Sequence, residues 1–235
     1  MMLYKRVLLK LSGECLAGNK VGGGIDENTL ANTAKVLKEA HDLGVQLAIV
    51  VGGGNFWRGR SSKNMDRVTA DQIGMLATCM NALALSDALE QAGLDVRVMS
   101  SIEMRQIAEL YIRKRALRHL EKGRVIVFAC GLGNPYLSTD TTAALRAAEI
   151  KAELFLKATN IDGVYDKDPK TDKNAQRFSI ITHDEVLRRN LKVMDATAAA
   201  LCRDNKTDIF VFDVRDPRNI LRALETTDCG TLVHS

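Results

Sequence analysis

The chain has 235 residues, enough for one large α/β domain with a well-buried core, and no Pro- or Ser-rich linker divides it. Apolar residues make up 46% and charged residues 26%, and the net charge of +4 is too small to indicate a nucleic-acid or membrane partner. No apolar run approaches the roughly 18 residues of a membrane-spanning helix. Because of the length and the lack of a linker, we expect a single domain over residues 1–235.

Short apolar or β-branched runs alternate with longer segments of helical period along the chain. Strands are predicted at residues 6–11, 45–51, 95–99, 124–130, 153–157, 208–213 and 231–234. Several of these runs are apolar on both faces, as in strands that are covered by helices on both sides. The alternation predicts an α/β fold, a three-layer αβα sandwich around a mostly parallel central sheet.

The helices between the strands carry recognisable start and stop signals. The sequence Thr-Ala-Asp-Gln at 69–72 predicts a capping box at the start of a helix that Gly93 ends. A second capping box at 182–185 predicts another helix start. Gly44 ends a helix that begins near Asp26.

The cysteines and histidines do not indicate a metal site. The five cysteines are an odd number, are widely scattered and form no Cys-x-x-Cys pair. This distribution argues against a disulfide framework and favours reduced thiols that fill gaps in the core of a cytoplasmic protein. The four histidines lie at helical, capping or terminal positions, where we expect them to be solvated rather than catalytic.

Three glycine-bearing turns follow predicted strands. The turn Lys10–Glu14 follows the first strand, Gly52–Arg60 follows the second and Gly131–Asp140 follows the fourth. Ligands of a parallel sheet collect at the carboxyl ends of its strands, where these turns are expected to meet. Glycine lets backbone N–H groups approach a phosphate closely, and the hydroxyl side chains within 138–141 can cap a helix whose N-terminus attracts anions.

Three cations accompany these turns. Lys10 and Lys157 end predicted strands, and Arg58 follows the triple glycine. Each lysine alone would be interpreted as a solvated strand-end residue, but together with three turns they favour phosphate binding. Two facing anion sites indicate two phosphorylated ligands, or phosphoryl transfer between them, which needs positioning and positive charge and commonly Mg²⁺. No Ser-His-Asp order, HExxH motif or glycosidase carboxylate pair competes with this hypothesis.

Five segments of the chain resemble a known family. KLSGE, VVGGGNFWRG, GNPYLSTDTTAALRAAEI, DGVYDKDP and KVMDATA resemble, in order, the signature segments of the bacterial uridylate (UMP) kinases of the amino-acid-kinase fold family. The resemblance runs from Lys5 to about Val233 and separates the chain from the aspartate, acetylglutamate and carbamate kinases. It implies ATP- and Mg²⁺-dependent phosphorylation of UMP to UDP in pyrimidine nucleotide biosynthesis, by direct in-line transfer. The N-terminal part would mainly hold UMP and the C-terminal part mainly ATP.

The resemblance also implies roles for individual residues. Those implied to be catalytic are Lys10, Lys157, Asp140 and Asp195. Those implied to bind ATP are Lys10, Leu11, Ser12, Gly13, Gly54, Arg58, Thr159, Tyr165 and Asp168. Those implied to bind UMP are Gly53, Asp71, Leu132, Gly133, Asn134, Pro135, Tyr136, Leu137, Ser138 and Thr139. The residues that hold the metal are not implied.

Physical chemistry makes these roles reasonable and offers simpler readings beside them. Asp71 could accept hydrogen bonds from both ribose hydroxyls, and the Tyr165 ring could pack on a base. The simpler readings are ordinary packing for Tyr165, a turn residue for Asp168 and helix capping for Asp140. The chain departs from the family at Leu132, where threonine is expected, so a side-chain hydrogen bond to the nucleotide is absent or replaced there.

The basic run Arg113–Arg124 is most simply a solvated helix face. No aromatic side chains interleave with its cations, which disfavours an RNA platform. The resemblance implies a homohexamer that GTP activates and UTP inhibits, and Arg97 and Arg124 match positions of a GTP site between subunits.

Alternative functions remain open at this point. One is a kinase of the same fold with a carboxylate or carbamate substrate. Another is a nucleotide-binding regulatory module without turnover, for which a salt-dependent affinity for nucleic acid is expected. The combined presence of Lys10, Arg58, Asp140 and Lys157 favours an active enzyme. A dehydrogenase is disfavoured, because no G-x-G-x-x-G follows the first strand.

Overall fold

The computed structural model describes residues 4–18, 23–58, 64–169, 171–191 and 193–235, so Gly59, Arg60 and Lys192 of the predicted motifs lie outside it. The strands are β1 Arg6–Leu11, β2 Gln46–Val51, β3 Val96–Ser100, β4 Glu109–Leu110, β5 Val125–Ala129, β6 Leu154–Thr159, β7 Val164–Tyr165, β8 Arg177–Phe178, β9 Ile180–Thr182, β10 Asp208–Asp213 and β11 Gly230–His234. The helices are α1 Gly13–Ala17, α2 Glu27–Asp42, α3 Arg67–Gln91, α4 Arg113–Glu121, α5 Thr139–Ile150, α6 His183–Arg188, α7 Ala196–Asp204 and α8 Asn219–Glu225.

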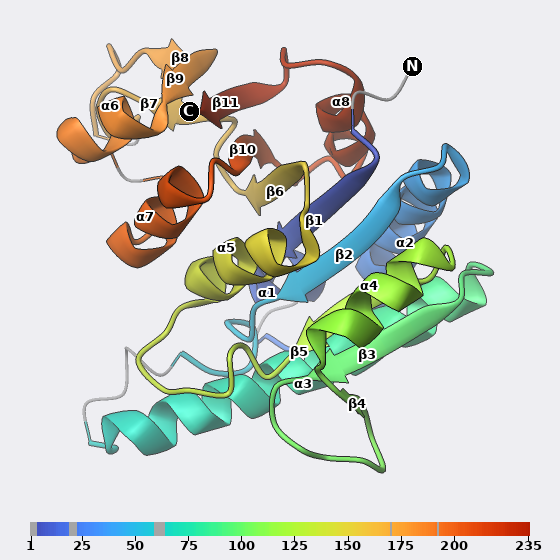
Figure 1. The fold of residues 1–235 in the computed structure, drawn as a ribbon. Coiled ribbons are helices and arrows are strands. Elements are labelled where there is room, and N and C mark those ends of the chain that lie inside the picture. The colour runs from blue at the N-terminus through green and yellow to red at the C-terminus, as the bar shows by residue number, and fades with distance from the viewer. Residues whose placement is uncertain (1–3, 19–22, 59–63, 170, 192) are drawn as a thin grey trace.

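The central sheet is mostly parallel. Its strand order is β4-β3-β5-β2-β1-β6-β10-β11-β9, and β7 pairs with β8 in a separate hairpin (Figure 1). Among the described pairings of this sheet, only β10 with β11 is antiparallel. All seven predicted strands are present within one or two residues at each end. The four strands not predicted have two or three residues, too few for a periodic pattern to show.

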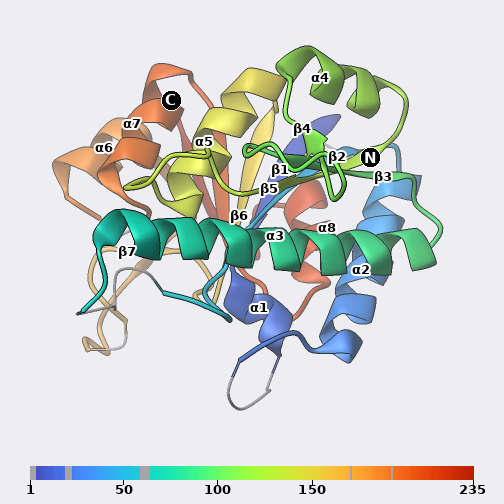
Figure 2. The same ribbon diagram turned by 90° about the horizontal axis from the view of Figure 1, so that it is seen from below.

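Helices cover both faces of the sheet and create two apolar cores. Alternate residues of β1 point to opposite faces, so Leu9 joins a core with α1, α2, α3 and α8, and Leu8 joins a core with α4, α5, α6 and α7. Figure 2 shows this layering, with α4 and α5 on one side of the strands and α1, α2 and α8 on the other. The fold class predicted from the sequence is therefore confirmed.

One predicted helix start is wrong and the other is confirmed. The helix α3 begins at Arg67, ahead of 69–72, because the Asp66 carboxylate caps it by accepting a hydrogen bond from the Thr69 backbone N–H at 3.0 Å. At 182–185 the Thr182 hydroxyl caps α6 as predicted. Gly44 and Gly93 have φ of 91° and 90°, the left-handed conformation that follows a helix end.

Two histidines differ from the prediction that all four are solvated. His119 and His183 are buried, 8% and 3% exposed. His183 is held by a hydrogen bond between Nε2 and the Thr207 carbonyl, and burial lowers its pKa. All five cysteines are free thiols, three of them buried, as expected for core-filling residues. In the described part of the chain no helix is both long and apolar enough to cross a membrane.

Candidate active site

Two lysines lie side by side at the carboxyl ends of the central strands. Because β1 pairs with β6 in parallel, Lys10 is the register partner of Lys157. Their side chains are 13% and 9% exposed, so neither is a solvated strand-end lysine. Asp140, in the first turn of α5, lies between them, with Oδ1 3.1 Å from Lys10 Nζ and Oδ2 hydrogen-bonded to Lys157 Nζ. The simpler reading of Asp140 as a helix cap is wrong, because Ser138 occupies the cap position.

The charges in this cluster are mutually dependent. Burial alone would raise the pKa of Asp140, but the two ammonium groups outweigh it and hold the pKa below its usual value. Burial lowers the pKa of Lys157, and the attraction of Asp140 only partly opposes that shift while the charge of Lys10 adds to it. Two lysines thus face one shared carboxylate, an arrangement that offers ammonium donors to an anion entering beside them.

A second carboxylate joins the helices that border the cluster. Asp195 caps α7 by accepting from the Ala198 N–H at 3.0 Å. It also accepts hydrogen bonds from the hydroxyls of Ser138 and Thr141. Ser138 in turn caps α5 by accepting from the Thr141 N–H at 3.0 Å. The N-termini of α5 and α7, each with unpaired backbone donors, therefore lie together at one point.

The first two glycine turns press against each other. A Cβ on Gly13 would lie 2.3 Å from Asn55 Oδ1 and 2.8 Å from the Gly52 carbonyl, so only glycine fits between them. A Cβ on Gly53 would lie 2.9 Å from the Gly74 carbonyl of α3. Arg58, at the end of the second turn, forms an exposed ion pair with Glu14. A solvated pair of this kind exchanges readily for an incoming anion.

The third turn is held by side chains from α3. Cys130 has φ of 60°, and its N–H donates to the Thr78 hydroxyl at 2.9 Å. Further along, the Tyr136 N–H donates to Asp71 Oδ2 at 2.8 Å, and Arg67 Nε donates to the same oxygen at 2.8 Å. Asp71 is therefore placed at the turn predicted to bind the nucleotide, and among the described residues both hydrogen bonds go to Oδ2 rather than to its second oxygen.

Three cavities open along this edge of the sheet. The α3 cavity, of about 290 Å³, is lined by nine of the predicted residues, Gly53, Gly54, Arg58, Asp71, Leu132, Asn134, Leu137, Ser138 and Thr139. The central cavity, of about 560 Å³, is lined by Lys10, Arg58, Ser138, Thr139, Asp140, Val193, Met194 and Asp195. The β6 cavity, of about 370 Å³, includes Lys157, Thr159, Tyr165 and Asp168.

The cavities are neighbours that share lining residues. The α3 cavity and the central cavity share Arg58, Ser138 and Thr139, and the central cavity and the β6 cavity share Val193. The structure thus gathers Lys10, Lys157, Arg58 and the glycine turns around one cleft, as the sequence predicts. This arrangement has room for one ligand on each side and a phosphoryl group between them.

Six other predicted residues support the cleft without lining these cavities. They are Leu11, Ser12, Gly13, Gly133, Pro135 and Tyr136. Leu11 is buried in the core, and Ser12 caps α1. Gly133 has a left-handed backbone conformation, with φ of 74°, and a Cβ added to it would lie 3.0 Å from the Ser101 carbonyl oxygen. Tyr136 is exposed, with the Arg67 guanidinium 5.4 Å from its ring centroid.

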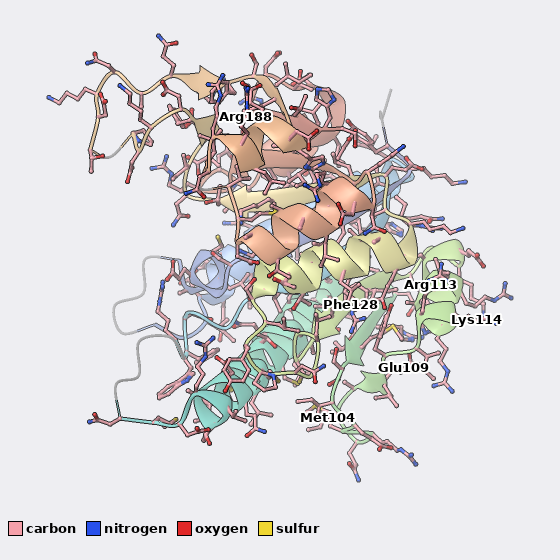
Figure 3. All side chains as sticks on the ribbon, turned by 60° about the vertical axis from the view of Figure 1, so that its left-hand side comes forward. Met104, Glu109, Arg113, Lys114, Phe128 and Arg188 are labelled. Carbon is pink, nitrogen blue, oxygen red and sulfur yellow. The ribbon has the colours of Figure 1, made fainter. Side chains whose placement is uncertain are left out.

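Arg97 and Arg124 lie apart from the cleft. Both form ion pairs with Asp95 at the amino ends of β3 and β5, the edge opposite the glycine turns. The basic run is an exposed helix face, as predicted for most of its length: Figure 3 shows Arg113 and Lys114 on the outer side of α4. The GTP-site role of the two arginines remains a prediction.

Several residues of the cleft were not predicted from the sequence. The β6 cavity is also lined by Arg189, Asn190 and Leu191, which follow α6, and no motif marked them. Thr78 and Asn81 of α3 are buried and hydrogen-bonded to the glycine turns. Two polar residues spaced i, i+3 within the otherwise apolar stretch 73–85 of this helix were the signal that could have found this pair.

Comparisons with known proteins agree with this geometry. The model of the amino acid kinase family matches residues 5–213. A UMP kinase from Bacillus anthracis superimposes with a TM-score of 0.94 at 38% identity, over 98% of this chain and 96% of that one. A UMP kinase from Ureaplasma parvum gives 0.94 at 39% identity over 100% of both chains. A uridylate kinase from Archaeoglobus fulgidus gives 0.74 at 27% identity, over 99% and 100%. The chain belongs to the amino acid kinase family.

Proposed function

We propose that the protein transfers the terminal phosphoryl group of ATP to UMP and makes UDP for pyrimidine nucleotide biosynthesis in the cytoplasm. The observation that carries the proposal is the row of neighbouring cavities with Lys10, Asp140 and Lys157 at its centre. The names of the similar structures from Bacillus anthracis and Ureaplasma parvum, both UMP kinases, support the choice of acceptor. We treat residues 1–235 as a single catalytic domain.

The α3 cavity is the proposed UMP site. The N-terminal half supplies its turn at Gly53 and its carboxylate at Asp71, which accepts from the ribose hydroxyls through the oxygen not engaged by Tyr136. The turn 132–139 holds the remainder of UMP. Leu132 contributes backbone groups but no hydroxyl, so the contact made there is a main-chain one.

The β6 cavity is the proposed ATP site. Its lining from the C-terminal half includes Thr159, Tyr165 and Asp168. Tyr165 is half-buried, and its hydroxyl donates to Asp162 at 2.8 Å, which fixes the ring beside the cavity. The phosphates would extend from here into the central cavity, toward the turns at Ser12, Gly13 and Gly54 and toward Arg58.

The transfer itself needs charge and alignment rather than a covalent enzyme intermediate. An oxygen of the UMP phosphate attacks the γ-phosphorus of ATP and forms a new P–O bond. The bond between the γ-phosphorus and the β,γ-bridging oxygen breaks, and its electron pair stays on that oxygen in the departing ADP. Lys10 and Lys157 stabilise the negative charge on the transferring group, and Asp140 holds both ammonium groups in place. Asp195 acts through Ser138 by fixing the N-terminus of α5 beside them.

The residues present fit a Mg²⁺ ion that the nucleotide carries. Among the described residues, no three metal-ligating side chains gather at one point. Asp140 and Asp195 line the central cavity, but both are already engaged by lysines or hydroxyls. Magnesium commonly binds through substrate phosphates, water and one or two carboxylates. When bound, it would neutralise phosphate charge.

Replacing Lys10 by alanine tests the proposal. We expect kcat for UDP formation to fall about 100-fold or more, while the KM for UMP changes far less, because Lys10 acts on the transferring group. Lys5→Ala is the matched control, since Lys5 is exposed just ahead of the same strand. An unchanged kcat in Lys10→Ala contradicts the assigned role.

A substrate panel separates the alternatives. UMP, CMP, aspartate and acetylglutamate are offered with ATP, and ADP release is followed with and without GTP. Preferential phosphorylation of an amino acid overturns the proposal. Nucleotide binding without ADP release, combined with salt-dependent binding of DNA or RNA, favours a regulatory module.

We also propose that the protein is a homohexamer activated by GTP and inhibited by UTP, with Arg97 and Arg124 at the GTP site. The two arginines converge on Asp95, and both side chains are partly exposed. Light scattering measures the oligomer. An Arg124→Ala variant that keeps full GTP activation would remove that residue from the site.

A further inference from the structure

We infer that Asn81 is a positioning residue for phosphoryl transfer: a reciprocal pair of amides, the buried Asn81 and the half-buried Asn55, sets the place of the Gly52–Gly54 turn. The inference rests on the proposed function and assigns a role to a helix residue that contacts no cavity. Asn81 lies in α3 and is completely buried, so it acts through the turn and not on a substrate.

The two amides hydrogen-bond to each other in both directions. Asn81 Nδ2 donates to Asn55 Oδ1 at 2.7 Å, and Asn55 Nδ2 donates to Asn81 Oδ1 at 2.9 Å. The second hydrogen of Asn81 Nδ2 goes to the Gly52 carbonyl at 2.7 Å, and that of Asn55 Nδ2 goes to the Gly24 carbonyl at 2.6 Å. Both carbonyls can only accept, which sets the orientation of each amide.

This pair reaches the transfer site in one step. The Gly52 carbonyl and Asn55 Oδ1 are the atoms that a Cβ on Gly13 would overlap, at 2.8 and 2.3 Å. Gly13 follows β1, the strand that ends in Lys10 and Leu11. A shift of the Gly52–Gly54 turn would therefore displace the turn after Lys10. Gly53 and Gly54 also line the α3 cavity.

The same helix anchors the third glycine turn. Thr78, one turn before Asn81, accepts from the Cys130 N–H and donates to the Met75 carbonyl at 2.7 Å. Two turns on separate strands are thus held at a defined separation by two buried polar side chains of one helix. Reactions between bound groups are sensitive to such separations, and a displacement of about 1 Å can slow them 100-fold.

Asn81 has a geometric role besides a stabilising one. Leucine could fill its space, but it would leave the Gly52 carbonyl and the Asn55 amide without this partner, which also destabilises the fold. What leucine cannot do is hold the Gly52 carbonyl at a set distance and direction. The pair therefore also sets the geometry of the turn.

The test compares Asn81→Leu with Leu85→Val in the full-length protein. Leu85 is also fully buried in α3, one turn further on, and it lines none of the cavities. For Asn81→Leu we expect kcat to fall at least tenfold, with the KM values for UMP and ATP within about threefold of wild type. Leu85→Val is expected to lower the melting temperature but to keep kcat within about twofold.

Hydrogen exchange gives a readout that does not depend on turnover. The backbone amides of residues 52–55 are expected to exchange faster in Asn81→Leu and at the wild-type rate in Leu85→Val. If Asn81→Leu does not fold, Asn55→Ala takes its place in both measurements, because Asn55 is the other member of the pair and is only half-buried. In the double variant kcat should fall no further than in the worse single variant, because both changes break one unit.

Wild-type kcat in Asn81→Leu and Asn55→Ala overturns the inference, and so does an equal loss of kcat in Leu85→Val. If wild-type protein forms no UDP from UMP, the proposed function fails first. That outcome is distinguishable, because it is measured on the unmodified chain.

Discussion

Asp140→Asn is expected to destabilise the fold strongly at neutral pH. The substitution keeps the shape of the side chain but removes the one carboxylate that pairs with both Lys10 and Lys157. Their side chains are only 13% and 9% exposed, so water replaces the lost partner only in part. Removing one member of a buried ion pair lowers the free energy of unfolding by about 3–5 kcal/mol. For a chain of this length that is a fall of about 6–20 °C in melting temperature.

The deficit should shrink as the pH rises. Asp140 raises the pKa of Lys157 against the effect of burial, so in the variant that pKa falls further below 10.5. At a pH between the pKa of Lys157 in the folded variant and its pKa in the unfolded chain, the unfolded chain binds more protons, so the stability of the variant increases with pH. The stability of the wild type increases in this way only at higher pH, because its folded-state pKa for Lys157 is less depressed. The wild-type Asp140 contribution is complete above the ordinary carboxyl pKa of 3.8 and disappears only as pH falls through its lowered value.

Thermal unfolding at pH 7 and pH 9 measures both effects. Asp95→Asn is the matched control, since Asp95 also pairs with two cations, Arg97 and Arg124, but is 52% exposed. Its melting temperature should change by less than about 4 °C, as for a solvated ion pair. If Asp140→Asn melts like the control, or its deficit is the same at both pH values, the cluster does not depend on this carboxylate.

Three other predictions follow from the cleft. Gly53→Ala should lower the free energy of unfolding by about 1–3 kcal/mol in denaturant titration, because the new Cβ would meet α3. At Gly54 the nearest atom to a new Cβ is 3.8 Å away, so Gly54→Ala should change that free energy by less than about 0.5 kcal/mol, and equal losses in the two variants would contradict this. The alkaline fall of kcat should have an apparent pKa below 10.5, because burial lowers the pKa of Lys157, and a profile flat to that pH would refute the link. Asp71→Asn should raise the KM for UMP about tenfold or more, by weakening charge-assisted hydrogen bonds, and an unchanged KM would place the ribose elsewhere.

Local signals were enough to predict most elements of the fold. The strand Arg6–Leu11 and the strand Asp208–Asp213 have the predicted bounds, because short runs rich in apolar and β-branched residues between turn residues favour a strand. The start of α3 was missed because two capping signals lie three residues apart and Asp66 provides the cap. The buried state of His119 and His183 depends on elements distant in sequence, Glu109 on β4 and Thr207 before β10.

The sequence by itself determined which turns carry glycine, which strand ends carry lysine, and that helices alternate with parallel strands. These properties follow from side-chain chemistry and short-range periodicity. Only the tertiary structure decided that β1 lies between β2 and β6, which makes neighbours of Lys10 and Lys157 and brings Asp140 between them. It also decided that Asn81 meets Asn55. Strand order and helix placement arise from the packing of two cores, where residues far apart in the chain compete for the same space.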